Sequence, residues 1–450
     1  MTKEELLQRR ISDEPALGFI SKFLENFQNA KLYLVGGAVR DTILGRSMRE
    51  LDYDFVIGGL DATQVEKWFA SQGEVGLFGK TFGVFKFMPH GFTHDQIEYI
   101  DIALPRTESS LPNSAGGYKD FEIQSDPSIS IEDDLARRDF TINAIAFDLR
   151  EHVLIDPFNG QLDLERRVIK TVGNPEERFS EDLSRMLRAV RFASELSFDI
   201  EEETLKTIRN RGVKLNLERK VESKLEYVVP REIIGLELAK ALERNPPSAI
   251  HWLQKSELME VLFPEVQRII DVDQTYTLPL TQLKQEPLTV TTSLLLRAID
   301  PDTIDDILTH TGLTTLPRES SRRIVSPEIK WLISRLHPPL SIEDIQHMPG
   351  AQFEKWFMNG HSSHLLTIME YIGQGSETAA VRMRRSTIES RWLVESGEKI
   401  PPLLSGDDIL HAGVEQGPKV RQLLDDCRSA QLAGEIMTRE TALKWMKARV

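Results

Sequence analysis

The amino-acid sequence predicts an α+β fold, in which a small β-sheet with few helices is followed by helices alone. Residues 31–155 carry short runs of β-branched and aromatic residues separated by glycines, which is typical of strands: KLYLV, YDFVI, FGVFKFM, IEYIDIA and HVLIDPF. From about residue 175 the apolar residues recur every three or four positions, which is typical of helices, as in EDLSRMLRAVRFASEL and REIIGLELAKALER. At 450 residues the chain is too long for one hydrophobic core, so several domains are expected.

The first predicted strand, residues 31–35, runs directly into two glycines. Gly36 and Gly37 open a short predicted helix, and the backbone N–H groups at the positive end of its dipole favour a bound phosphate chain. Arg40 on the same helix adds a positive charge. A second predicted strand follows, so residues 31–57 contain strand, helix and strand in the order of a βαβ unit.

This second strand presents two aspartates, Asp52 and Asp54, with one residue between them. Side chains alternate between the faces of a strand, so both carboxylates project the same way and repel each other unless a cation lies between them. Such oxygen ligands suit Mg²⁺, which is usually held by one or two carboxylates together with substrate phosphates. Each feature alone also occurs as a solvated strand edge, a tight turn or a surface arginine. Their joint order favours phosphoryl or nucleotidyl transfer on a triphosphate.

The next strand offers a third candidate carboxylate. Asp101, in EYIDIALPR, fits a position on a strand beside the first two aspartates, although an exposed strand aspartate would show the same pattern. The polar stretch at residues 105–131 then separates the strands from the helical part. It is long enough to be a mobile loop, and we expect one there.

A second group of charged residues lies in the helical part, where Asp182, Arg185, Arg188 and Arg191 follow one another in steps of three. Three residues along a helix advance by about 300°, so Asp182 and Arg185 are expected side by side. One interpretation is an i, i+3 ion pair with arginines on a solvated face. The other is recognition of a nucleotide base, because a carboxylate only accepts hydrogen bonds and a guanidinium only donates them.

If Asp182 and Arg185 contact a nucleotide base, they would discriminate between the four bases. Cytosine and adenine both present an amino donor beside a ring-nitrogen acceptor, so Asp182 would accept from the amino group while Arg185 donates to the ring nitrogen. Uracil and guanine present the opposite order and would leave buried partners unpaired. Mismatches of this kind give discrimination on the order of 10⁴ or more. The pair therefore predicts selection of C and A.

The charge distribution permits a nucleic-acid partner without predicting one. The net charge is −15, yet residues 161–224 contain 14 Lys and Arg against 13 Asp and Glu. Basic groups cluster in residues 206–224 and again in residues 381–386, and such a stripe suffices to follow a phosphate backbone. Solvated helix faces produce the same runs. Prolines near 246–247, 287 and 338–339 predict breaks between helical subdivisions.

The remaining features favour a cytoplasmic protein. Cys427 is the single cysteine, so no internal disulfide framework is expected and a reducing compartment fits. The N-terminal residues MTKEELLQRR contain no apolar signal region, and no run approaches ~20 apolar residues. We therefore expect neither export nor a membrane span.

Residues 34–57, LVGGAVRDTILGRSMRELDYDFVI, resemble the signature of the DNA polymerase β-like nucleotidyltransferases, and more narrowly the class II tRNA nucleotidyltransferases (CCA-adding enzymes) and bacterial poly(A) polymerases. The resemblance continues through ARRDFTINAIAFD, IDPFNGQLDLERRVIKTVG and RFSEDLSRMLRAVRFASELSF, up to about residue 200. It returns more weakly in residues 401–424. It implies a mixed α/β nucleotidyltransferase head with a small β-sheet over residues 1–172, an all-helical neck over 173–245, a body over 246–345 and a tRNA-binding tail over 346–450.

The resemblance also implies a reaction and roles for the residues. Asp52 and Asp54 would hold Mg²⁺, with Asp101 as a third catalytic carboxylate, while the tRNA 3′-hydroxyl attacks the α-phosphorus of CTP or ATP and pyrophosphate leaves. The nucleotide would be bound by residues of three segments: Gly37, Arg40, Arg138, Asp182, Arg185, Arg188 and Arg191. Residues 105–131 match the flexible loop that helps switch from C to A, although an insertion-like stretch precedes Tyr118. A monomer or a homodimer is expected.

Three alternatives share much of this pattern. A partial enzyme that adds only A or only CC, and a poly(A) polymerase with broader RNA acceptors, would keep nearly every residue named. A catalytically inactive RNA-binding module would be expected to lose the aspartate pair, which this chain retains.

Overall fold

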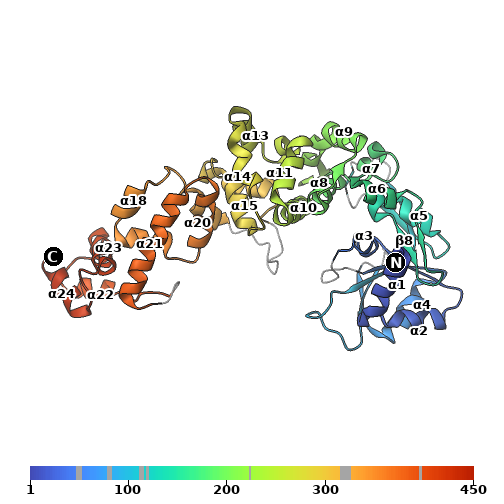
Figure 1. The fold of residues 1–450 in the computed structure, drawn as a ribbon, viewed down its shortest axis with the longest axis horizontal. Coiled ribbons are helices and arrows are strands. Elements are labelled where there is room, and N and C mark those ends of the chain that lie inside the picture. The colour runs from blue at the N-terminus through green and yellow to red at the C-terminus, as the bar shows by residue number, and fades with distance from the viewer. Residues whose placement is uncertain are drawn as a thin grey trace. The chain divides into compact units, whose positions relative to one another are not determined.

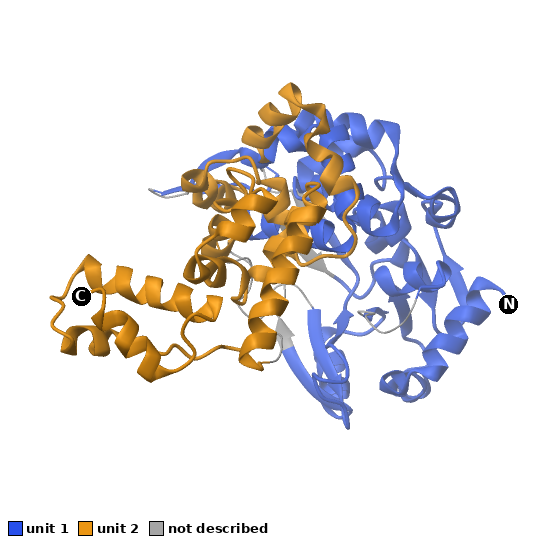
Figure 2. Ribbon diagram, turned by 60° about the vertical axis from the view of Figure 1, so that its left-hand side comes forward, with its two compact units in different colours: residues 1–262 blue, residues 263–450 orange. Residues whose placement is uncertain are grey.

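The computed structural model describes residues 1–46, 53–78, 84–110, 116–117, 121–221, 224–314, 326–394 and 398–450 (Figure 1). Asp52 and Tyr118 lie outside these ranges. The chain forms two compact units, residues 1–262 and residues 263–450 (Figure 2). The predicted α+β class is confirmed, because the strands lie in the first unit and the second is helical in its described part. The four-part division predicted from the sequence is finer than these two units and stays a prediction.

The first unit contains a seven-stranded sheet with the strand order β3-β4-β5-β2-β1-β8-β9. Its strands are β1 (Lys31–Val35), β2 (Asp54–Gly58), β3 (Gly73–Phe78), β4 (Val84–Pro89), β5 (Ile100–Ala103), β8 (Ala146–Asp148) and β9 (Val153–Ile155). The five predicted strands correspond to β1, β2, β4, β5 and β9, whereas β3 and β8 had no clear signal in the sequence. β8 has only three residues and is defined by pairing with β1 and β9 on either side.

The strand directions correct one prediction. β1 and β2 run antiparallel, so the strand–helix–strand segment is not a βαβ unit, in which the strands are parallel. The helix between them is α3 (Gly37–Ile43). β2 pairs in parallel with β5 instead, and this pairing places Asp54 directly opposite Asp101.

The two faces of the sheet carry separate apolar layers. On one face, Phe55 of β2 packs edge-on against Phe19 of α2 (Phe19–Asn26), which also contacts Phe69 of α4 (Ala62–Ala70). The next residue of β2, Val56, points the other way and joins a buried cluster with Val35 and Leu135. By the same alternation Asp54 shares the face of Val56, so the carboxylate lies on the side opposite the aromatic layer.

The other described α-helices of the first unit lie beside this sheet or follow it in the chain. They are α1 (Lys3–Asp13), α5 (Ile131–Ala136), α6 (Gly160–Arg166), α7 (Pro175–Glu181), α8 (Arg185–Leu196), α9 (Glu202–Arg211), α10 (Arg231–Arg244), α11 (Pro246–Lys255) and α12 (Leu258–Leu262). α10 has the bounds of the predicted REIIGLELAKALER helix. α8 begins four residues later than predicted, because the side chain of Asp182 accepts from the backbone N–H of Ser184 and ends the preceding helix.

The described residues of the first unit also form three two-stranded sheets. The stretch predicted as a mobile loop contains an antiparallel pair, β6 (Arg106–Ser110) with β7 (Phe121–Ser125), so these ten residues form a β-ribbon and not an irregular loop. The sequence signal was weak because these strands are mostly polar. β10 (Val168–Ile169) pairs with β11 (Asp199–Ile200), and β12 (Glu218–Val221) pairs with β13 (Lys224–Tyr227).

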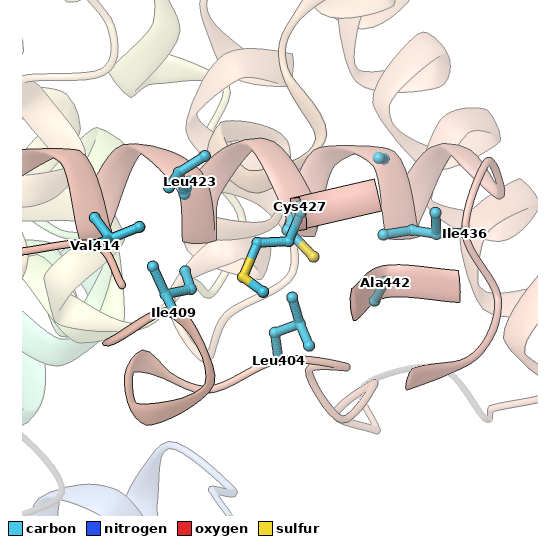
Figure 3. Packing of buried hydrophobic residues seen from close by; sticks show 9 residues of the cluster. Leu404, Ile409, Val414, Leu423, Cys427, Ile436 and Ala442 are labelled. Carbon is cyan, nitrogen blue, oxygen red and sulfur yellow. The ribbon is translucent and has the colours of Figure 1, made fainter. Parts of the chain in front are cut away.

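The second unit is built from α13 (Pro264–Val272), α14 (Leu278–Thr281), α15 (Leu288–Leu295), α16 (Ile304–His310), α17 (Ser326–Ile333), α18 (Ile342–His347), α19 (Gly350–Phe357), α20 (Ser362–Tyr371), α21 (Gly375–Trp392), α22 (Gly406–His411), α23 (Pro418–Ala433) and α24 (Arg439–Lys447). The predicted proline breaks are confirmed, since Pro246 begins α11 and Pro287 precedes α15. Near the C-terminus, Leu404, Leu423 and Cys427 contribute to a small buried core (Figure 3). In the described part of the chain, no helix combines the length and apolar character needed to cross a lipid bilayer.

Candidate active site

A cavity of about 1130 Å³ opens in the first unit, on the face of the sheet that carries Asp54. It is lined by residues of β2 and β5, of α3, of the segment after α5, and of α8 and α10. Nine of the ten predicted site residues line it: Gly37, Arg40, Asp54, Asp101, Arg138, Asp182, Arg185, Arg188 and Arg191. The tenth, Asp52, lies outside the described residues. Segments more than 80 positions apart in the sequence therefore converge on one site.

The carboxylates of Asp54 and Asp101 are neighbours on parallel strands in direct register. Directly paired residues point to the same face of a sheet, so the two side chains are adjacent, and Asp101 has the position predicted for it on a neighbouring strand. Two adjacent carboxylates form an oxygen donor set that fits a hard divalent cation. Within the described residues no cluster of three or more metal-binding side chains occurs, and Asp52 lies outside them.

Gly36 makes the turn from β1 into α3. Its φ of +71° and ψ of −132° lie in a region that residues with a Cβ rarely adopt. A Cβ at this position would also lie 3.0 Å from Nη1 of Arg138 and 3.5 Å from Oδ2 of Asp54. The turn therefore needs glycine both for its backbone and for the close approach of two site residues.

We expect Gly36→Ala to cost about 1–3 kcal/mol of unfolding free energy, because the alanine strains the backbone and its Cβ displaces Arg138. Chemical denaturation would measure this effect. Gly37→Ala is the matched control, because a Cβ there meets only Nη2 of Arg40 at an ordinary 3.7 Å. Equal unfolding free energies of the two variants would contradict the requirement for glycine at position 36.

Arg40 is buried and held by two partners. Its guanidinium pairs with Asp41 at 2.8 Å and donates to Oδ1 of Asn143 at 2.7 Å. Asn143 in turn donates to Oδ1 of Asp139 at 3.0 Å. Arg40 therefore anchors α3 to the RRDFTINA segment and lends a positive charge to the cavity wall, in a fixed orientation.

Arg138 and its neighbour Arg137 share the buried carboxylate of Asp134. Arg137 donates to one carboxylate oxygen at 2.8 Å, and Arg138 lies 3.4 Å from the other. Burial alone would raise the pKa of Asp134, but the two guanidinium groups outweigh burial and hold the pKa below its usual value. Asp134 therefore stays ionised and fixes both arginines at the edge of the cavity.

Asp182 and Arg185 both line the cavity, but not as i, i+3 neighbours on one helix. Asp182 has an extended backbone between α7 and α8, and one of its oxygens accepts from Ser184 N–H at 2.8 Å. Arg185 is the first residue of α8 and forms its ion pair with Glu181 at 2.7 Å. The predicted single-helix geometry is therefore wrong, because the Asp182 side chain interrupts the helix. Both groups nonetheless lie at the start of α8.

Arg188 is bound to the buried carboxylate of Asp139, which no sequence motif singled out. Its Nε and Nη2 donate to one oxygen of Asp139 at 2.8 and 2.6 Å. Burial alone would raise the pKa of Asp139, but Arg188 and the hydrogen bond from Asn143 hold the pKa well below its usual value. The pKa of Arg188 is raised correspondingly, since Asp139 and Glu237 outweigh its own burial.

We expect Asp139→Asn to lower the free energy of unfolding by about 2 kcal/mol at pH 7, because Arg188, whose side chain is 35% exposed, loses the nearer of its two carboxylate partners. The folded-state pKa of Asp139 lies below the unfolded value of about 3.9, so its contribution is present above that value and is lost as the pH falls through the folded pKa. Urea denaturation at pH 7, 5, 4 and 3 would check this. The Asp139→Asn variant should show a flatter acid limb than wild type, and an unchanged pH profile would contradict the assignment.

Arg191 also forms ion pairs with carboxylates. It donates to Glu237 of α10 at 2.5 Å and pairs with Glu195 at 3.0 Å. Its guanidinium lies 3.9 Å from the centre of the Phe192 ring. Arg191 thus joins α8 to α10 beside the cavity. The sequence predicted Arg191 only as a nucleotide contact and did not predict this structural link. Glu237 is buried and had no signal in a single sequence, because its partner lies 46 positions away.

The chain is similar to known proteins in sequence over part of its length. Residues 32–170 match the family model described as Poly A polymerase head domain. The "Multifunctional CCA protein" of Neisseria gonorrhoeae (strain NCCP11945) is 40% identical over 244 residues, which are 54% of this chain and 52% of that protein. The protein of the same name from Stenotrophomonas maltophilia (strain K279a) is 39% identical over 248 residues, 54% of each. The chain spans about half the length of the curated relatives it matches.

Solved structures extend the likeness in fold over nearly the whole chain. The Bacillus stearothermophilus CCA-adding enzyme in complex with CTP has a TM-score of 0.70 and 23% identity, and the match covers 97% of this chain and 98% of that one. The Thermotoga maritima CCA-adding enzyme complexed with tRNA has a TM-score of 0.63 and 21% identity, with 99% and 98% covered. At these identities the likeness shows the fold.

Proposed function

We propose that the protein is a tRNA nucleotidyltransferase, since its residues 32–170 match the family of the poly A polymerase head domain. It adds C, C and A to the 3′ end of tRNA from CTP and ATP, without a nucleic-acid template, and releases pyrophosphate. The observation that carries this proposal is a single cavity that joins the carboxylates of Asp54 and Asp101 to the base-reading candidates Asp182 and Arg185. The carboxylates of Asp54 and Asp101 alone would not determine which base is added.

The carboxylates supply the reactive end of the site. The family match implies a divalent metal, and the oxygen donors of Asp54 and Asp101, with Asp52 beside them in the sequence, fit Mg²⁺. The metal would neutralise the triphosphate and lower the barrier to in-line attack by the 3′-hydroxyl. Arg40 and Arg138 add fixed positive charge on the same cavity wall, and we assign them to the phosphate chain.

The start of α8 supplies the base-selecting end. One oxygen of Asp182 is used by Ser184 N–H, and the second is the one that we propose accepts from the amino group of C or A. Arg185 is oriented by Glu181 and by the backbone carbonyls of Arg178 and Arg137. From this fixed orientation we propose that its guanidinium donates to the ring nitrogen. A template made of fixed side chains would explain selection of two bases without a nucleic-acid template.

The relatives support this proposal. Proteins named Multifunctional CCA protein match 54% of this chain, and solved CCA-adding enzymes of the same fold are described in complexes with CTP, ATP and tRNA. The single cysteine fits a reducing compartment, so we place the reaction in the cytoplasm.

One assay tests the proposal against its alternatives. Purified protein is given labelled tRNA transcripts ending at the discriminator base, at the first C or at the second C, with CTP and ATP supplied singly and together. Complete CCA on the shortest transcript is the expected result. Addition of CC only, or of A only to the longest transcript, would identify a partial enzyme, and long A-tails on unrelated RNA would identify a poly(A) polymerase.

A further inference from the structure

We propose that Lys86 is a positioning residue of this active site. Its ammonium group pairs with the Asp101 carboxylate until a divalent metal displaces it. Lys86 would thereby set how tightly the metal binds. The inference rests on the proposed function, because it takes Asp54 and Asp101 as metal ligands. Nothing in the sequence motifs pointed to Lys86, which lies in the ordinary strand FGVFKFM.

The sheet fixes Lys86 beside the carboxylates. β4 and β5 are antiparallel, with Lys86 directly opposite Asp101, and β5 and β2 are parallel, with Asp101 directly opposite Asp54. Directly paired residues point to the same face, so the three side chains form a row across three adjacent strands. A cation therefore stands at one end of a row whose other two members are anions.

The contact between Lys86 and Asp101 is close and partly shielded from solvent. Nζ of Lys86 lies 2.5 Å from Oδ1 of Asp101, and the two side chains are 32% and 30% exposed. Without a metal, this ion pair offsets the repulsion between the adjacent carboxylates. A metal ion that takes Oδ1 of Asp101 as a ligand must displace the ammonium, so the two cations compete for one oxygen.

A second cavity gives the displaced ammonium room to move. It measures about 320 Å³ and shares Asp54 and Asp101 with the larger cavity. Its other lining residues are Lys86, His94, Glu98 and Tyr99. Because the lysine side chain is flexible, its ammonium can leave Asp101 and remain in this polar cavity.

The test is a binding titration without nucleotide or RNA. Free Mn²⁺ is followed by electron paramagnetic resonance in wild type, Lys86→Met, Lys86→Arg and Lys67→Met. Lys86→Met removes the competing charge at similar length and is expected to tighten Mn²⁺ binding about threefold or more, in line with the modest strength of a partly exposed ion pair. Lys86→Arg keeps the charge and should retain wild-type affinity. Lys67→Met changes an exposed lysine on α4 and should do the same.

A thermal readout separates competition from simple sheet stabilisation. Without metal, Lys86→Met should unfold at a lower temperature than wild type, and saturating Mg²⁺ should raise its Tm by more than it raises that of wild type. The proposal would be overturned if Lys86→Met lowered the Tm equally with and without Mg²⁺. It would also be overturned if Lys86→Met bound Mn²⁺ as tightly as wild type or more weakly. A wild-type protein that binds Mn²⁺ but extends no tRNA would contradict the proposed function instead, and the two failures are therefore distinguishable.

Discussion

Asp54→Asn is expected to reduce nucleotide addition by about 10³-fold or more with every acceptor and with both CTP and ATP. The substitution keeps the shape of the side chain but removes the negative charge that a bridging metal requires. Asp54 lies directly beside Asp101 and within reach of the Gly36 turn, so its loss affects the centre of the carboxylate group. Single-turnover extension of a labelled tRNA lacking its last residue measures the effect.

The binding of nucleotide provides the internal control. Arg40 and Arg138 are held by Asp41, Asn143 and Asp134, partners that Asp54→Asn does not touch, so ATP affinity should fall by only a fewfold. Asp13→Asn, which changes an exposed aspartate at the end of α1, should leave both properties unchanged. Extension by Asp54→Asn within tenfold of wild type would refute the metal assignment.

Much of the fold was predictable because its signals are local. The helix at residues 231–244 and the strands at residues 31–35 and 54–58 carry apolar periodicity that does not depend on distant partners. β8 escaped prediction because three residues form a strand only when β1 and β9 are present on either side. The antiparallel arrangement of β1 and β2 likewise depends on the whole sheet and not on the segment between them.

The candidate site shows the same limit. The predicted cations and the described aspartates among the predicted residues line one cavity, yet most of the carboxylates that hold the arginines were not predicted. Asp139 binds Arg188 from 49 positions away, and no periodicity in a single sequence links such residues. The start of α8 was misplaced for a local reason, since Asp182 can either continue a helix or end one by bonding to the backbone two residues on. Single-sequence patterns cannot decide between these two states.

The prediction with the second largest expected effect concerns that same residue. Asp182→Asn should reduce the preference for CTP over UTP by about 10²-fold, measured as the ratio of kcat/KM values on a tRNA that awaits its first C. The asparagine carbonyl can still accept from Ser184 N–H, so the turn that begins α8 is kept. Its other group becomes an NH₂ donor, which matches the carbonyl oxygen of uracil and no longer accepts from the cytosine amino group.

A complete inversion of preference is not expected, because Arg185 stays oriented by Glu181 and still presents a donor where uracil also carries an N–H. Arg185→Lys therefore makes a useful companion: it keeps one charge but loses the planar fork, and it should weaken the use of both CTP and ATP without admitting UTP. If Asp182→Asn kept full discrimination while its CD spectrum and Tm matched wild type, Asp182 would serve only as a helix cap. Other residues of the cavity would then have to select the base. The selection of C and A could no longer be explained by a carboxylate and a guanidinium at the start of α8.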